Sequence, residues 1–241
     1  MKKHAIVTGG TRGIGYAIVE MLIEEGYRVT LTYGHDESGA TACRERLAAR
    51  SADVELFRVD QSDPSQVAEF AATMRQQGAV DCLVLNAGTT FRHNSLEDVG
   101  NDDWERVMMV NVNTPFYLVR DLQPVMPNGS RIVFIASEMA VYPHSLSLAY
   151  GVSKSAVVAM AKNLVKYFEG TDTTVNAVAP GFVETEWQRT KAPEIRESIC
   201  RKTAVGRFGS PAEVADAVRF CLHNAFVNGS LLELNGGYCF K

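Results

Sequence analysis

The stretch Thr8-Gly9-Gly10-Thr11-Arg12-Gly13-Ile14-Gly15 decides the fold of this chain. It follows a short apolar run and opens a helical pattern in which apolar residues recur at positions 14, 17, 18, 21 and 22. Its glycines permit a tight turn and a close approach of backbone to a phosphate, and the N–H groups at the start of a helix favour a pyrophosphate. The stretch therefore predicts a dinucleotide-binding strand–turn–helix unit rather than a plain turn.

Short apolar runs alternate with helical patterns along the rest of the chain. We expect strands at residues 5–8, 28–33, 55–59, 82–86, 131–136, 174–178 and 231–234. These runs lack strict alternation of apolar and polar residues, as is typical of parallel strands covered on both faces. No linker or repeat interrupts the pattern, so residues 1–241 are expected to form one α/β domain.

Composition narrows the function classes. A net charge of −4 argues against nucleic acid as the main partner, and no apolar window is long enough to span a membrane. The first strand pattern begins too early to leave room for a signal peptide. Five scattered cysteines indicate a reducing compartment, here the cytoplasm, and neither cysteine nor histidine clusters as a metal site requires.

The end of the second predicted strand bears on the choice of dinucleotide. Folds that bind NAD place an acid there for the ribose 2′-hydroxyl, but residues 31–35 contain none before Asp36. Arg12 lies inside the glycine turn, where its guanidinium could pair with a 2′-phosphate, and His35 could assist. NADP(H) is therefore predicted. The alternative is that Arg12 is a surface charge and Asp36 reaches the ribose.

Tyr150 and Lys154 are the clearest candidates for chemistry. If their segment is helical, both side chains leave one face a turn apart. A nearby ammonium favours the phenolate, which makes Tyr150 a plausible proton donor or acceptor near neutral pH. Ser137 follows an apolar run, and its hydroxyl could hold a carbonyl oxygen against the tyrosine. Alone, the pair could equally be a solvated helix face with a lysine extended along it.

Together these motifs resemble the short-chain dehydrogenase/reductase family, over residues 5–237. Residues 8–15 match the glycine pattern of the family, residues 86–88 its N-A-G motif, and residues 180–185 its P-G-x-x-x-T stretch. Its catalytic tetrad is matched in order and spacing by Asn111, Ser137, Tyr150 and Lys154. The resemblance implies a single-domain Rossmann fold, with a doubly wound seven-stranded parallel sheet in the order 3-2-1-4-5-6-7 and helices on both faces.

The resemblance also implies a role for each motif. Tyr150 would protonate the alkoxide as hydride arrives, while Lys154 would lower the pKa of the tyrosine and hold the nicotinamide ribose. Ser137 would polarise the carbonyl, and Asn111 would fix a water that links Lys154 to solvent. The cofactor is expected to contact Gly9, Thr11, Arg12, Gly13, Ile14, Gly15, Tyr33, His35, Asp60, Gln61, Asn86, Ala87, Gly88, Tyr150, Lys154, Pro180, Gly181, Val183 and Thr185.

The closest resemblance is to the 3-oxoacyl-acyl-carrier-protein reductase branch of the family. It implies an NADP-dependent oxidoreductase, a cytoplasmic homotetramer that reduces a ketone, carrier-bound or a small molecule, to a secondary alcohol. Its contacts would use the helices near 102–122 and 150–168. A free ketone stays open because residues 127–130 and 169–172, where carrier-docking reductases tend to have arginines, are neutral and acidic here.

Three segments are expected to surround the substrate. They are a lid at about 184–205, the loop 138–144 and residues 89–93. Two other functions compete with that of a reductase. A non-catalytic NADP-sensing protein would not need the complete tetrad, and a nucleotide-sugar dehydratase or epimerase would need a second domain.

Overall fold

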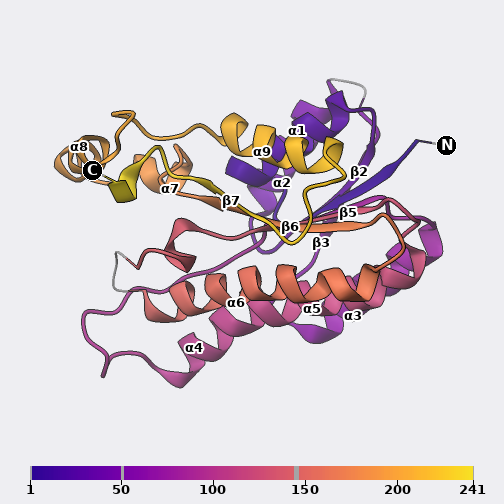
Figure 1. Cartoon of the computed structure of the whole chain (residues 1–241), viewed down its shortest axis with the longest axis horizontal. Coiled ribbons are helices and arrows are strands. Elements are labelled where there is room, and N and C mark those ends of the chain that lie inside the picture. The colour runs from indigo at the N-terminus through magenta and orange to yellow at the C-terminus, as the bar shows by residue number, and fades with distance from the viewer. Residues whose placement is uncertain (1, 50–51, 144–146, 241) are drawn as a thin grey trace.

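Seven parallel strands form one sheet in the computed structural model, which describes residues 2–49, 52–143 and 147–240 apart from the side chain of Cys239 (Figure 1). The order is β3-β2-β1-β4-β5-β6-β7, which confirms the predicted topology. The strands are β1 (His4–Val7), β2 (Arg28–Tyr33), β3 (Val54–Arg58), β4 (Cys82–Leu85), β5 (Arg131–Ile135), β6 (Thr174–Pro180) and β7 (Leu231–Leu234).

Helices cover both faces of the sheet, which explains why the strands do not alternate apolar and polar residues (Figure 1). One face carries α1 (Gly13–Glu24), α2 (Glu37–Ala48) and α9 (Pro211–His223). The opposite face carries α3 (Pro64–Gln77), α4 (Asn101–Met108), α5 (Thr114–Leu122) and α6 (Leu148–Leu164). Two short helices, α7 (Glu186–Arg189) and α8 (Pro193–Lys202), lie beyond the carboxyl ends of the strands. Single 3₁₀ turns occur at Gln123–Val125, Glu138–Ala140, Val165–Phe168 and Tyr238–Phe240.

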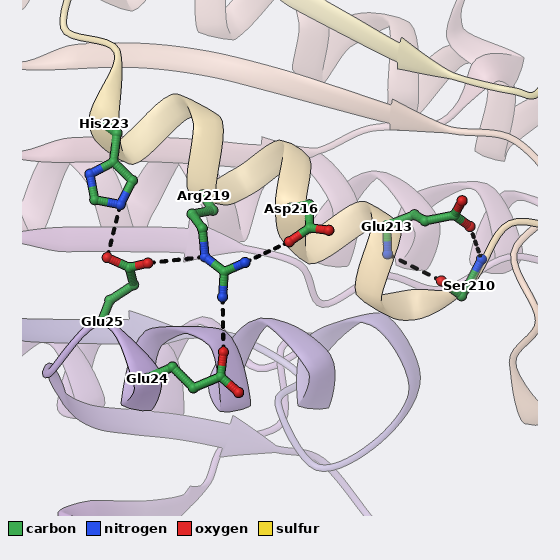
Figure 2. Close-up of polar contacts among 7 residues, drawn as sticks. All are labelled: Glu24, Glu25, Ser210, Glu213, Asp216, Arg219 and His223. Atoms are coloured by element: carbon green, nitrogen blue, oxygen red, sulfur yellow. Dashed lines mark hydrogen bonds and ion pairs between the residues drawn. The ribbon is translucent and has the colours of Figure 1, made fainter.

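The first and last long helices are joined by a charged network (Figure 2). Arg219 on α9 donates to Glu24 and Glu25 at the end of α1, at 2.9 and 3.0 Å, and His223 lies 2.8 Å from Glu25. Ser210 and Glu213 form a capping box at the start of α9. These partly exposed pairs add modestly to stability, but they fix the helix that follows the glycine turn.

The long helix expected near 102–122 is interrupted. A π-helical turn, Met109–Asn113, separates α4 from α5. Such a turn inserts one residue into the hydrogen-bond ladder and bends the helix, and these turns are frequent at functional sites. Asn111 lies within it and is buried, so the interruption falls at a predicted site residue.

No helix in the described residues is both long enough and apolar enough to cross a membrane.

Candidate active site

The glycine turn has the geometry that its sequence requires. Gly9 and Gly13 adopt φ angles of +66° and +54°, where a side chain would be strained. A Cβ on Gly15 would lie 2.1 Å from the carbonyl oxygen of Gly9. Asn86 holds the turn against the end of β4, because its side-chain amide donates to the carbonyls of Thr8 and Gly9 at 2.9 Å. The glycines therefore let the turn pack this closely against Asn86, and the N–H groups at the start of α1 are the ones that could bind a phosphate.

Arg12 and Asp36 meet at the end of β2. The Arg12 guanidinium lies 3.5 Å from the Asp36 carboxylate and 3.7 Å from Glu186 at the start of α7. Asp36 caps α2, where the Gly39 N–H and the Ser38 hydroxyl donate to it and lower its pKa. The carboxylate that could have taken a ribose hydroxyl is thus already engaged. Arg12 is exposed, and among the residues that the structure describes its guanidinium makes two long ion pairs.

Two adjoining cavities of about 220 and 150 Å³ open between the carboxyl ends of the strands and α7. Both are lined by Thr90, Ser137, Tyr150, Gly181, Trp187 and Gln188. The larger, which we call the cofactor cavity, also contains Ile14, Asn86, Gly88, Thr89, Ile135, Ala136, Lys154, Pro180, Val183 and Thr185. The smaller, the substrate cavity, adds Arg92, Glu138, Met139, Ser147, Phe182 and Lys191. Ser137 and Tyr150 therefore lie where the two cavities join.

The structure brings together only some of the predicted cofactor residues in these cavities. Nine line the cofactor cavity: Ile14, Asn86, Gly88, Tyr150, Lys154, Pro180, Gly181, Val183 and Thr185. Ten lie outside both cavities: Gly9, Thr11, Arg12, Gly13, Gly15, Tyr33, His35, Asp60, Gln61 and Ala87. Of these, His35 and Asp60 face each other, with 3.3 Å between the ring Nε2 and the carboxylate.

Ser137, Tyr150 and Lys154 come together from two elements. Ser137 follows β5, and its side chain is hydrogen-bonded to the Tyr150 hydroxyl. Lys154, one turn further along α6, donates from Nζ to the carbonyl of Ile135 at 2.7 Å. Its Nζ lies 5.6 Å from the centre of the Tyr150 ring. The two hydroxyls thus lie together just beyond β5, and the buried ammonium of Lys154 lies close to the tyrosine ring.

Asn111 ties the loop after β4 to α6. Its amide donates to the Thr89 carbonyl and to Ser153 Oγ, both at 2.9 Å, and its Oδ1 accepts from the Thr89 N–H at 2.8 Å. Both amide hydrogens are engaged in this way, so a water held by Asn111 would have to donate to the second lone pair of Oδ1 or to the backbone carbonyl.

Burial controls the protonation of the central pair. Burial raises the pKa of Tyr150, and the hydrogen bond from Ser137 only partly opposes it. Burial also lowers the pKa of Lys154 to about 8. The expected lowering of the tyrosine pKa by Lys154 is therefore wrong: burial sets the direction of the shift, and the group that opposes it is Ser137. Tyr150 is protonated at neutral pH and can act as a proton donor.

Comparison with known proteins identifies the family. A family model described as "Enoyl-(Acyl carrier protein) reductase" matches residues 9–239. The chain is 32% identical over 240 residues to 3-oxoacyl-[acyl-carrier-protein] reductase FabG of Escherichia coli (strain K12), covering 98% of this chain and 96% of that protein. A short-chain dehydrogenase/reductase from Serratia marcescens BCRC 10948 superposes with a TM-score of 0.91 at 32% identity, over 98% and 97% of the two chains. This chain is a short-chain dehydrogenase/reductase. A short chain dehydrogenase from Burkholderia cenocepacia J2315, solved in complex with NADP, has the same TM-score at 29% identity, over 98% of each chain.

Several residues around the site of this short-chain dehydrogenase/reductase escaped the sequence analysis. Ser147 and Phe182 line the substrate cavity, and Ser153 links Asn111 to α6. In the sequence, the signal for Ser153 is its position directly before the catalytic Lys154. Of the loop expected at 138–144, Glu138 and Met139 line the substrate cavity, whereas His144 lies outside the described residues. No cluster of three or more potential metal ligands occurs among the described residues.

Replacing Lys154 with methionine should remove a pH-dependent contribution to stability. The pKa is about 8 in the folded protein, against 10.5 for an ordinary lysine, so the unfolded chain binds more protons between these values. The stability contributed by Lys154 therefore rises with pH through that window, by at most about 3 kcal/mol. We expect the difference in unfolding free energy between wild type and Lys154→Met, measured by urea denaturation, to grow from pH 8 to pH 10. The control is Lys166→Met, which changes an exposed lysine. If the difference in unfolding free energy were independent of pH for both variants, the lowered pKa of Lys154 would be contradicted.

Proposed function

We propose that this enzyme uses NADPH to reduce a ketone to a secondary alcohol at the junction of the two cavities. The observation that carries the proposal is the hydrogen bond between the Ser137 and Tyr150 hydroxyls at that junction, with buried Lys154 behind it. This chain is an NADP-dependent oxidoreductase that acts on CH–OH and C=O groups.

The cofactor site fits NADP(H). The open backbone of the glycine turn would hold the pyrophosphate, and exposed Arg12 would pair with the 2′-phosphate. Gly88 faces Lys154, since a Cβ there would lie 3.4 Å from Nζ, so a larger residue would narrow the cofactor cavity. The NADP complex of the Burkholderia relative supports this choice. NADPH supplies the hydride for the carbonyl carbon.

Side chains of this protein would polarise the carbonyl oxygen and supply the proton that it takes up. Tyr150 and Ser137 would both donate to the carbonyl oxygen, and this polarises the carbonyl. Tyr150 would then give its proton to the developing alkoxide. Lys154 would stabilise the phenolate that remains, since a buried cation acts strongly in a site with little solvent. Asn111 would keep the loop after β4 in place beside Lys154.

The first candidate substrate is a β-ketoacyl thioester, bound to a carrier protein or free, because the curated relatives are 3-oxoacyl-carrier-protein reductases. The family description names an enoyl group, but two hydroxyl donors aimed at one point suit a carbonyl oxygen better. A free small-molecule ketone is the second candidate. Arg131 is the arginine beside the expected carrier-docking segments, and its guanidinium donates to the carbonyls of Gly129, Ser130, Asp172 and Leu222 rather than facing a partner.

The chain would work as one catalytic domain, residues 1–241, with the segment 184–205 covering the substrate. A cytoplasmic location agrees with the free thiols of Cys43, Cys82, Cys200 and Cys221.

A homotetramer would bury apolar side chains that the single chain exposes. Phe116 on α5 and Leu148 and Val152 on α6 are 40–48% exposed. Tyr167, just beyond α6, is 77% exposed. Light scattering should therefore give about four times the chain mass of 26.4 kDa, and elution at the monomer mass would contradict this assembly.

Tyr150→Phe tests the chemistry. The variant keeps the ring and loses the proton, so NADPH oxidation should fall at least about a hundredfold while NADPH affinity stays near that of wild type. The assay is a screen of β-ketoacyl thioesters and free ketones, with Tyr167→Phe as the matched exposed control. Unchanged turnover in Tyr150→Phe would overturn the acid role. Tight NADPH binding by wild type without turnover of any ketone would favour a sensing protein instead.

Arg12→Gln tests the choice of cofactor. Loss of a charge-assisted bond to the 2′-phosphate should raise the KM for NADPH about tenfold or more, and should change the KM for NADH little. Arg75→Gln, at the end of α3, is the control. Equal KM values for NADPH and NADH in wild type, or an Arg12→Gln variant with unchanged NADPH affinity, would contradict the assignment.

A further inference from the structure

The lid carries several cations, and the structure pairs three of its arginines. Arg196 donates to Glu184 at 2.6 Å, Arg189 lies 3.5 Å from the same carboxylate, and Arg201 lies 3.6 Å from Glu197. Lys191, between α7 and α8, differs: within the described residues its ammonium has neither an ion pair nor a hydrogen bond. Lys191 also lines the substrate cavity, where it is half-buried.

A second cation reaches the same cavity from another wall. Arg92 belongs to the loop after β4 and is exposed, and no carboxylate in the described part of the chain pairs with it. The two charges act on each other: the pKa of Lys191 is lowered first by burial and then by Arg92. Two like charges held close without a counter-ion are unfavourable, and an anion between them would relieve both.

We propose that Arg92 and Lys191 form a binding site for an anionic group on the ketone substrate. This inference rests on the proposed function and narrows its substrate class. A cavity of about 150 Å³ holds a molecule of roughly benzene size, so the anion lies only a few bonds from the carbonyl that faces Tyr150. A carboxylate or phosphate on a small ketone has this form.

Glu138 bears on the orientation of the substrate in the substrate cavity. Its carboxylate follows Ser137 in sequence and lines the same cavity, but it is 1% exposed and packs against Gly181, where a Cβ would lie 2.8 Å from Oε2. A carboxyl group beside the catalytic serine offers an anion a poorer binding position than the two cations do. The substrate is therefore bound with its ketone at Ser137 and Tyr150 and its anionic group at Arg92 and Lys191.

The test compares an anionic with a neutral member in each of two pairs of β-keto substrates. Acetoacetate is paired with ethyl acetoacetate, and acetoacetyl-coenzyme A with the acetoacetyl thioester of N-acetylcysteamine, so a carboxylate and the coenzyme phosphates are examined separately. For each pair the ratio of kcat/KM, anionic over neutral, is measured by NADPH oxidation in wild type, Lys191→Gln and Arg92→Gln. Binding of each compound to the NADP⁺-loaded protein is measured in parallel by calorimetry. Arg201→Gln, which removes a lid cation already paired with Glu197, is the control.

We expect wild type to prefer acetoacetate over ethyl acetoacetate about tenfold or more. Lys191→Gln and Arg92→Gln should each lower that ratio about tenfold, and Arg201→Gln should leave it unchanged. A preference in the second pair alone would mean that the recognised charge is on the distant coenzyme phosphates, and it would overturn an anion site a few bonds from the carbonyl. Turnover without a charge preference, or a preference that survives both substitutions, overturns the anion site and leaves the reductase proposal standing. Charge-dependent binding lost in Lys191→Gln, but without turnover of any ketone, supports the anion site and overturns the reductase.

Discussion

The buried ammonium of Lys154 is the constraint on which the site depends. Its Nζ donates at 2.7 Å to the carbonyl of Ile135, the last residue of β5, while the side chain remains 4% exposed. That bond fixes the start of α6 against the end of β5, so Tyr150 meets Ser137 two residues beyond Ile135. Burial works against the charge, as the pKa near 8 shows. The fold therefore holds an ammonium group at a position where its charge costs folding free energy. Such a position is typical of a functional site rather than of a stabilising surface ion pair.

Around Lys154, some charged side chains pair with one another and others face the two cavities. Cations and carboxylates of the lid neutralise one another at Glu184 and Glu197, which leaves Lys191 facing the cavity with Arg92. At the other end of the site, Arg12 is shared between Asp36 and Glu186, and a phosphate there would compete with both carboxylates. The same sheet edge thus offers one cationic position to the cofactor and another to the substrate, with two neutral hydroxyl donors between them.

The sheet and its turns could be predicted because they follow local rules. β2 and β7 begin and end as expected, and the glycine turn has positive φ angles at Gly9 and Gly13. Properties that depend on packing across elements could not be predicted. The π-helical turn at Asn111 arises within a segment whose pattern is that of a plain helix. The pKa of Tyr150 follows burial, which spacing along a helix does not reveal, and the separation of Lys191 from its paired neighbours depends on side-chain geometry in the lid.

The central claim is that the Tyr150 and Ser137 hydroxyls hold the oxygen that is reduced. A crystal structure with NADP⁺ and an unreactive ketone analogue tests it most directly. The account predicts the ketone oxygen within about 2.6–3.2 Å of both hydroxyls, with the nicotinamide ring in the cofactor cavity beside Lys154. A ketone bound elsewhere, or a nicotinamide ring turned away from Tyr150, would contradict it.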